Sequence, residues 1–216
     1  VDTKLVLEFG MNIASGMSHL HRENILHCDL AARNLLVSQH NSKYQLKVSD
    51  FGLARITETE VYDVSKSPTF PIRWTAPEAL RGHRVSRASD VWSFGIVLWE
   101  ITECRAPYPG MSNLEVVSQV CDHGYRLPRP QRIDIPDELW NLMMQCWSQE
   151  PAERPTFDEI YQILERLLQE YEQNHQQQPA ANTELVSNNN NNKVYESQYM
   201  STKYGRGAYN RNSSNS

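Results

Sequence analysis

The chain has 216 residues with a formal net charge of −5, and 39% of them are hydrophobic. That length suffices for one buried core with or without a tail, because compact domains usually span roughly 100–150 residues, and the acidic balance argues against a nucleic-acid-binding protein. The longest apolar run, near residues 91–99, is well short of the ~20 residues that cross a bilayer, so we expect no membrane span in this segment.

The first predicted element is an amphipathic helix that leads to the segment around His27. Its apolar residues recur at helical spacing, at Leu5, Phe9, Ile13, Met17 and Leu20. Two short apolar runs follow, at 35–37 and 46–48, and the polar turn between them predicts a two-stranded ribbon. The ribbon would bring Asn34, at one end, close to Asp50, just beyond the other.

Three further helices are predicted after the ribbon. Residues 88–101 are apolar on nearly every side, which is typical of a helix buried all round. The next helix lies behind Pro136, a residue tolerated at the first helical position, and carries apolar residues from 139 to 147. The last helix begins with a capping box between Thr156 and Glu159, and its apolar stripe runs from Phe157 to Tyr171.

The composition changes after this stripe. From Gln173 onward the chain consists of Gln, Asn, Ser and scattered Tyr with almost no aliphatic residues, so it cannot bury enough apolar surface to fold alone. We therefore expect a folded domain over residues 1–171 and a disordered tail over 172–216. The predicted fold class is mainly α (α+β), with one short β-ribbon.

Three motifs in a fixed order indicate the chemistry. The letters HCDLAARN at 27–34 are followed by DFG at 50–52 and by APE at 76–78. Each motif is short enough to occur by chance, but the three in this order and spacing are hard to produce accidentally. Together they resemble the protein tyrosine kinase family, and residues 1–171 are similar to the C-terminal lobe of the kinase catalytic domain.

The resemblance implies an enzyme that transfers the γ-phosphate of ATP to tyrosine hydroxyls of protein substrates in signal transduction, with Mg²⁺ as the metal. Asp29 matches the catalytic aspartate, which orients the hydroxyl and accepts its proton. Arg33 follows two alanines, as in tyrosine kinases, and favours tyrosine as the acceptor. Asn34 and Asp50 match the metal ligands, and magnesium prefers such hard oxygen atoms. The alternative for either aspartate is a loop residue that caps a turn.

The resemblance also covers the substrate floor and the activation loop. Pro71 and Trp74, in the stretch FPIRWTAPE at 70–78, resemble the floor on which a phenol ring rests, and ordinary packing is the alternative. Tyr62 matches an activation-loop phosphosite, whose phosphate would seek arginines. Cys28 replaces the family's arginine, so Arg55 remains as a partner. We expect weaker dependence on Tyr62 phosphorylation, or impaired activity.

Three charged residues match structural positions of the family. Glu78 of APE matches the partner of Arg154 in an ion pair that joins distant parts of the chain. Asp90, at the start of the buried helix, matches an aspartate that accepts hydrogen bonds from the catalytic-loop backbone. Buried charges of this kind must be satisfied.

The printed sequence contains no G-x-G-x-x-G loop, and the residues before His27 hold no Val-Ala-Ile-Lys-like strand. We therefore expect the carboxy-terminal part of a longer polypeptide that is inactive by itself. The rival hypothesis is an inactive kinase-like module that acts as a docking scaffold. Its tail tyrosines, once phosphorylated, would bind SH2-type proteins; these are Tyr195, Tyr199, Tyr204 and Tyr209.

The cysteines and the amino terminus bear on location. The four cysteines, at 28, 104, 121 and 146, are widely spaced and lack metal-ligand spacing, which suits reduced thiols in the cytosol. No cleavable signal pattern is present at the amino terminus. We expect a cytoplasmic protein, or one at the cytoplasmic side of the plasma membrane if the parent is a receptor.

Overall fold

Helix α3 (Arg87–Glu103) forms the centre of the core, as the all-round apolar pattern predicts. The computed structural model describes residues 1–41, 43–57, 61–63 and 71–176. Every residue of α3 from Ser89 to Glu103 is buried. A helix with no solvent-exposed face must find hydrogen-bond partners for its polar side chains within the protein. The polar residues of α3 are therefore expected to bind neighbouring segments of the chain.

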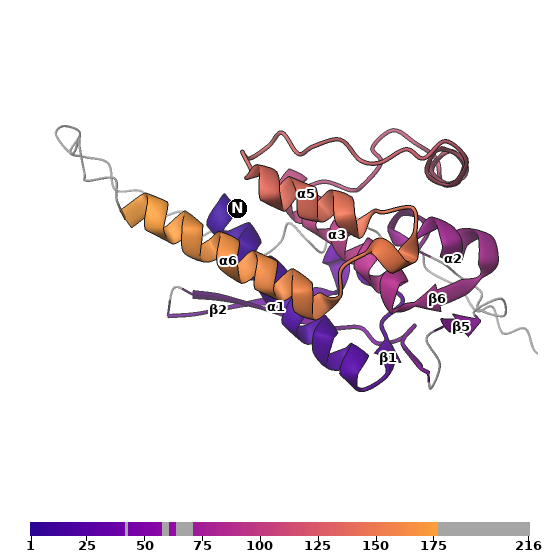
Figure 1. The fold of residues 1–216 in the computed structure, drawn as a ribbon, viewed down its shortest axis with the longest axis horizontal. Coiled ribbons are helices and arrows are strands. Elements are labelled where there is room, and N and C mark those ends of the chain that lie inside the picture. Colours follow the sequence, from indigo (N-terminus) through magenta and orange to yellow (C-terminus); the bar gives the residue numbers. More distant parts are fainter. Residues whose placement is uncertain (42, 58–60, 64–70, 177–216) are drawn as a thin grey trace, which may run out of the picture. The chain divides into compact units, whose positions relative to one another are not determined.

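Helices α1 (Thr3–Arg22) and α6 (Phe157–Gln176) pack along one another (Figure 1). Asp2 is the N-cap of helix α1, and its carboxylate accepts the Leu5 N–H at 2.8 Å. The predicted capping box of α6 is confirmed, because the Thr156 N–H donates to Glu159 at 2.7 Å and the Glu159 N–H donates back to the Thr156 hydroxyl at 3.3 Å.

Helix α6 extends farther than the sequence analysis expected. It continues through Gln176, so residues 172–176, assigned above to the tail, are helical. Once the apolar stripe of a long helix is packed, the backbone hydrogen bonds can continue into the polar residues at its end. Composition alone does not reveal this extension. The rest of the expected tail, 177–216, lies outside the described residues.

The predicted ribbon is present as strands β2 (Leu35–His40) and β3 (Lys43–Val48), with Leu35 opposite Val48. The expectation of a single ribbon is wrong, because two others occur: β1 (Ile25–Leu26) pairs with β4 (Arg55–Ile56), and β5 (Val61–Asp63) pairs with β6 (Arg84–Ser86). Strands of two or three residues are too short to show the alternation by which strands are recognised. Their pairing depends on tertiary contacts.

Helix α5 (Asp137–Cys146) crosses α3 at Gly95. A Cβ atom on Gly95 would lie 2.6 Å from the Trp147 indole nitrogen and 2.9 Å from the Cys146 Cβ, so only glycine allows this approach without movement. The sequence suggested Pro136 as the first helical residue of α5. In the structure Pro136 is the N-cap, and the helix begins one position later, at Asp137.

Short elements complete the described chain. They are the 3₁₀ turns η1 (Ala32–Asn34), η2 (Ile72–Trp74) and η4 (Pro151–Glu153), helices α2 (Pro77–Gly82) and α4 (Asn113–Val117), and the π turn η3 (Ser118–Asp122). All four cysteines are free thiols. Within the described ranges, no helix combines the length and the apolar character needed to cross a membrane.

Candidate active site

Asp90 ties the HCD segment to the buried helix. Its carboxylate accepts the backbone N–H of His27 at 2.9 Å and that of Cys28 at 3.0 Å. The His21 Nε2 atom lies 3.0 Å from the same group. Asp90 is 1% exposed and lies in the first turn of α3, where the helix dipole favours a negative charge. The loop that carries Asp29 is therefore attached to the buried helix α3.

His27 joins this loop to the segment before Asp50. The ring is fully buried; its Nδ1 lies 3.3 Å from the Asp29 N–H, and its Nε2 lies 3.2 Å from the Ser49 carbonyl oxygen. A neutral imidazole with its proton on Nε2 satisfies both contacts. The ring also lies 5.5 Å from that of Phe51, between centroids. One side chain thus connects the HCD and DFG motifs.

The Asp29 carboxylate is held by two neighbours on η1. Arg33 donates from Nη2 to one oxygen, and Asn34 donates from Nδ2 to the other at 3.0 Å. The same Asn34 nitrogen also donates to the Asp29 carbonyl at 2.7 Å. The Asp29 side chain remains 15% exposed, so it is oriented by the protein and still partly open to solvent. Because Nδ2 serves Asp29, the Asn34 atom able to bind a cation is Oδ1.

Asp50 is brought to Asn34 through the backbone. The N–H and the hydroxyl of Ser49 both donate to the Asn34 carbonyl, at 2.9 Å and 2.8 Å. Asp50 itself has a φ of +62°, which is uncommon for a residue with a side chain, and one carboxylate oxygen accepts the Gly52 N–H at 3.2 Å. Across the described residues, no hydrogen bond joins the Asp50 carboxylate to Asp29 or Asn34. The structure thus brings Asp29 and Asn34 into contact and places Asp50 next to them, with its carboxylate capping a turn.

The oxygen atoms of Asn34 and Asp50 suit a magnesium ion that is shared with a nucleotide better than a metal ion held by protein ligands alone. In the described part of the chain, no group of three or more His, Cys, Asp and Glu residues could hold a metal ion. Mg²⁺ at nucleotide sites typically takes one or two protein oxygen ligands together with phosphate oxygens and water. The Asn34 amide oxygen and the exposed Asp50 carboxylate have that chemistry.

Trp74 connects Arg33 to a buried glutamate that the sequence analysis missed. The Arg33 guanidinium carbon lies 4.5 Å from the centroid of the Trp74 ring. The indole N–H donates to Glu100 at 2.7 Å, and the Ala32 N–H donates to the same oxygen at 3.0 Å. Burial raises the pKa of Glu100. The available signal was a single charged residue within the mainly apolar run at 91–101.

The segment around Trp74 is fixed on its other side by Arg73, also missed from sequence. Its guanidinium donates to three carbonyls in the loop before α4, those of Pro107, Tyr108 and Met111, and to the side chain of Asn113, the first residue of α4. Pro71 is half-buried, and its carbonyl accepts the Thr75 hydroxyl at 3.0 Å. Phe70 lies outside the described residues.

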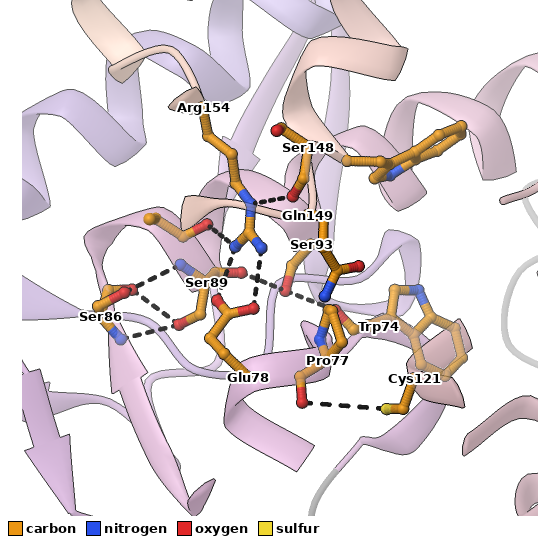
Figure 2. Close-up of polar contacts among 12 residues, drawn as sticks. Trp74, Pro77, Glu78, Ser86, Ser89, Ser93, Cys121, Ser148, Gln149 and Arg154 are labelled. Carbon is orange, nitrogen blue, oxygen red and sulfur yellow. Dashed lines mark hydrogen bonds and ion pairs between the residues drawn. The ribbon is translucent and has the colours of Figure 1, made fainter. Parts of the chain in front are cut away.

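Glu78 and Arg154 form an ion pair between distant parts of the chain (Figure 2). The two guanidinium nitrogens of Arg154 donate to the two carboxylate oxygens at 2.7 Å and 2.8 Å. Arg154 also donates to the carbonyls of Ala88 at 2.9 Å and Ser148 at 3.0 Å, and its guanidinium lies over Trp92. Its side chain is entirely buried. The pair joins α2, α3 and the turn before α6.

Cys28 lies in an apolar environment beside Tyr62. Both pack against a small buried cluster formed by Leu26, Ala79 and Val85, and Tyr62 is opposite Val85 in the β5–β6 pair. Burial, and then the nearby Asp90 charge, raises the pKa of the Cys28 thiol, so it is a poor nucleophile. The Arg55 guanidinium carbon lies 6.0 Å from the Tyr62 ring centroid.

Comparison with known proteins decides the family. A sequence model of the family described as "Protein tyrosine and serine/threonine kinase" matches residues 1–164. This chain belongs to that kinase family. It is 46% identical over 161 residues to Tyrosine-protein kinase SRK3 of Spongilla lacustris, covering 74% of this chain and 46% of that protein. It is also 46% identical over 161 residues to Tyrosine-protein kinase SRK2 of the same organism, covering 43% of that protein. The kinase chain thus spans just under half the length of these relatives.

Proposed function

We propose that this chain carries the catalytic base and the metal ligands of a protein-tyrosine kinase that phosphorylates protein substrates in signal transduction. The observation that supports this proposal best is the Asp29 carboxylate, held by Arg33 and Asn34 on a loop anchored to Asp90 and still partly exposed. The names of the relatives favour tyrosine as the acceptor. The chain is proposed to form the C-terminal lobe of the catalytic domain, within a longer protein.

In this proposal Asp29 accepts the proton of the substrate hydroxyl. A tyrosine hydroxyl is neutral at cellular pH, since its reference pKa is about 10, so a placed carboxylate orients the oxygen and takes its proton as transfer proceeds. Arg33 and Asn34 keep the carboxylate in one orientation. Asn34 and Asp50 would hold Mg²⁺, which neutralises charge on the ATP phosphates when bound. Trp74 and Pro71 would support the phenol ring.

The test uses the full-length protein and Asp29→Asn, which keeps the shape of the side chain and removes the base. We expect tyrosine phosphorylation of a peptide to fall by about 10²–10⁴-fold. The matched control is Asp137→Asn, since Asp137 also pairs with an arginine, Arg129 at 2.5 Å, but on the surface. Equal activity of Asp29→Asn and Asp137→Asn would refute the role of Asp29, and transfer to serine peptides alone would refute the tyrosine assignment.

The metal ligands have a separate test. Asn34→Ala and Asp50→Asn should each raise the Mg²⁺ concentration needed for half-maximal activity, because the first removes an oxygen ligand and the second replaces a charged carboxylate by a neutral amide. Gln45→Ala, a change on the exposed side of the adjacent ribbon, is the control. If neither site variant alters the Mg²⁺ dependence, these residues do not bind the metal.

Partners and location are also proposals. We propose tyrosine-containing proteins as substrates, SH2-type modules at the tail tyrosines, and a cytoplasmic site of action. Tyr195, Tyr199, Tyr204 and Tyr209 lie outside the described residues, so their role is inferred from sequence. Phosphorylated peptides spanning each tyrosine should bind an SH2 domain, and equal binding of the unphosphorylated peptides would contradict that role.

A further inference from the structure

Five residues around the proposed base form a closed circuit of contacts. Asp29 binds Arg33, whose guanidinium stacks on the Trp74 ring. The indole N–H of Trp74 then donates to Glu100, and Glu100 accepts the backbone N–H of Ala32, the residue before Arg33. The circuit begins and ends in the same loop. It therefore constrains the Arg33 side chain through the Trp74 ring, and the Arg33 backbone through the adjacent residue Ala32.

The Glu100 side of this circuit is buried. Glu100 is 9% exposed and belongs to α3, in which every residue from Ser89 to Glu103 is buried. One of its carboxylate oxygens receives both N–H groups, at 2.7 Å and 3.0 Å. Hydrogen bonds to a carboxylate are stronger than those between neutral groups, and a buried site excludes competing water. The catalytic loop and the proposed substrate floor are thus held on one atom.

We propose that Glu100 is a positioning residue of this kinase, which aligns Arg33 with Asp29 by holding the Ala32 amide and the Trp74 indole. The expected effect of Glu100 on the reaction rate rests on the proposed kinase function. Glu100 does not touch the reacting atoms; it acts through Trp74 and the loop backbone. Loss of the carboxylate would release the Trp74 ring and let Arg33 turn away from Asp29.

Helix α3 supplies a matched control. Glu103 is 8% exposed, and it also accepts two backbone N–H groups, from Gln131 at 2.5 Å and Arg132 at 3.1 Å. It also pairs with Arg105 at 3.0 Å, and none of these partners belongs to the circuit. Glu100→Ala and Glu103→Ala therefore remove similar groups from one helix, and only the first should affect the site.

The first experiment measures hydrogen exchange by NMR on the 216-residue chain. Glu100→Ala should speed exchange of the Ala32 amide and the Trp74 indole proton by about tenfold or more, because each loses its acceptor. Glu103→Ala should leave both rates unchanged and speed exchange at 131 and 132. Unchanged exchange at Ala32 and Trp74 in Glu100→Ala would overturn the proposal without any measurement of activity.

The second experiment measures kinetics of the full-length protein. Glu100→Ala should lower kcat by about 10- to 100-fold through misplacement of the base, with the KM for ATP within about twofold. Glu100→Gln keeps an oxygen acceptor and should recover most of the rate. Glu103→Ala should keep kcat within about twofold at a similar loss of thermal stability. Equal kcat losses in Glu100→Ala and Glu103→Ala would overturn the proposal. An inactive wild-type protein would instead refute the proposed function, and the hydrogen-exchange result would then decide the role of Glu100.

Discussion

Replacement of Arg154 by methionine tests how much the buried ion pair stabilises the domain. Methionine is similar in length and apolar, so the change removes the charge and the donors and keeps much of the packing. Arg154 has no exposed side-chain surface, and it donates to Glu78 and to the carbonyls of Ala88 and Ser148. Breaking a buried pair from one side costs about 3–5 kcal/mol, because the other partners lose their donors. The Glu78 side chain is 29% exposed, so water partly solvates the unpaired carboxylate, and we expect the lower end of this range, about 3 kcal/mol.

That cost predicts a large fall in Tm. For a domain of about 170 residues, each kcal/mol corresponds to roughly 2–4 °C, so Arg154→Met should lower the Tm by roughly 6–12 °C in differential scanning calorimetry. High salt should change this difference little, since a buried pair is weakly screened. Glu78→Gln in the Arg154→Met background should recover part of the loss, because it removes the unpaired carboxylate.

The control is a surface pair within α6. Arg166 and Glu170 lie 3.4 Å apart, with side chains 56% and 51% exposed. Arg166→Met should cost no more than about 0.5 kcal/mol. A Tm for Arg154→Met within about 2 °C of that for Arg166→Met would refute the assignment of a major stabilising role to the buried pair.

Three further outcomes are expected. Gly95→Ala should destabilise the chain by about 1–3 kcal/mol in urea unfolding, because its Cβ has no room where α5 crosses, and an unchanged midpoint would mean that the helices separate freely. Thr156 donates two hydrogen bonds to Glu159 and thereby lowers the pKa of Glu159. This stabilisation is present above the pKa of unfolded glutamate and is lost as the pH falls through the pKa of the folded state. The Tm of the wild type should therefore exceed that of Glu159→Gln by less below about pH 4, and a difference that stays constant with pH would contradict this prediction. In the full-length protein, Cys28→Arg should make activity depend more strongly on Tyr62, measured as the loss caused by Tyr62→Phe in each background, and equal losses would remove the idea.

The sequence predicted the long helices and the ribbon because each carries its signal within a short stretch. The capping box at Thr156, the stripe of α1 and the all-apolar run of α3 are local patterns, and the structure confirms them. The kinase motifs also lie within short stretches, which is why the family could be identified before any contact was known. Motif matching likewise placed Asp29 and Asn34 in one site, and the structure shows them in contact.

Tertiary structure decided what no local pattern specifies. Glu100 is 68 positions from Ala32 in the chain, and its acceptor role arises only when α3 packs against the loop. Strands β1 and β4 pair across about thirty residues, and each is too short to stabilise itself. The orientation of the Asp50 carboxylate toward Gly52 also depends on backbone geometry. A local pattern reports which face of an element is apolar, whereas the partners of a buried polar group are set by the packing of distant segments.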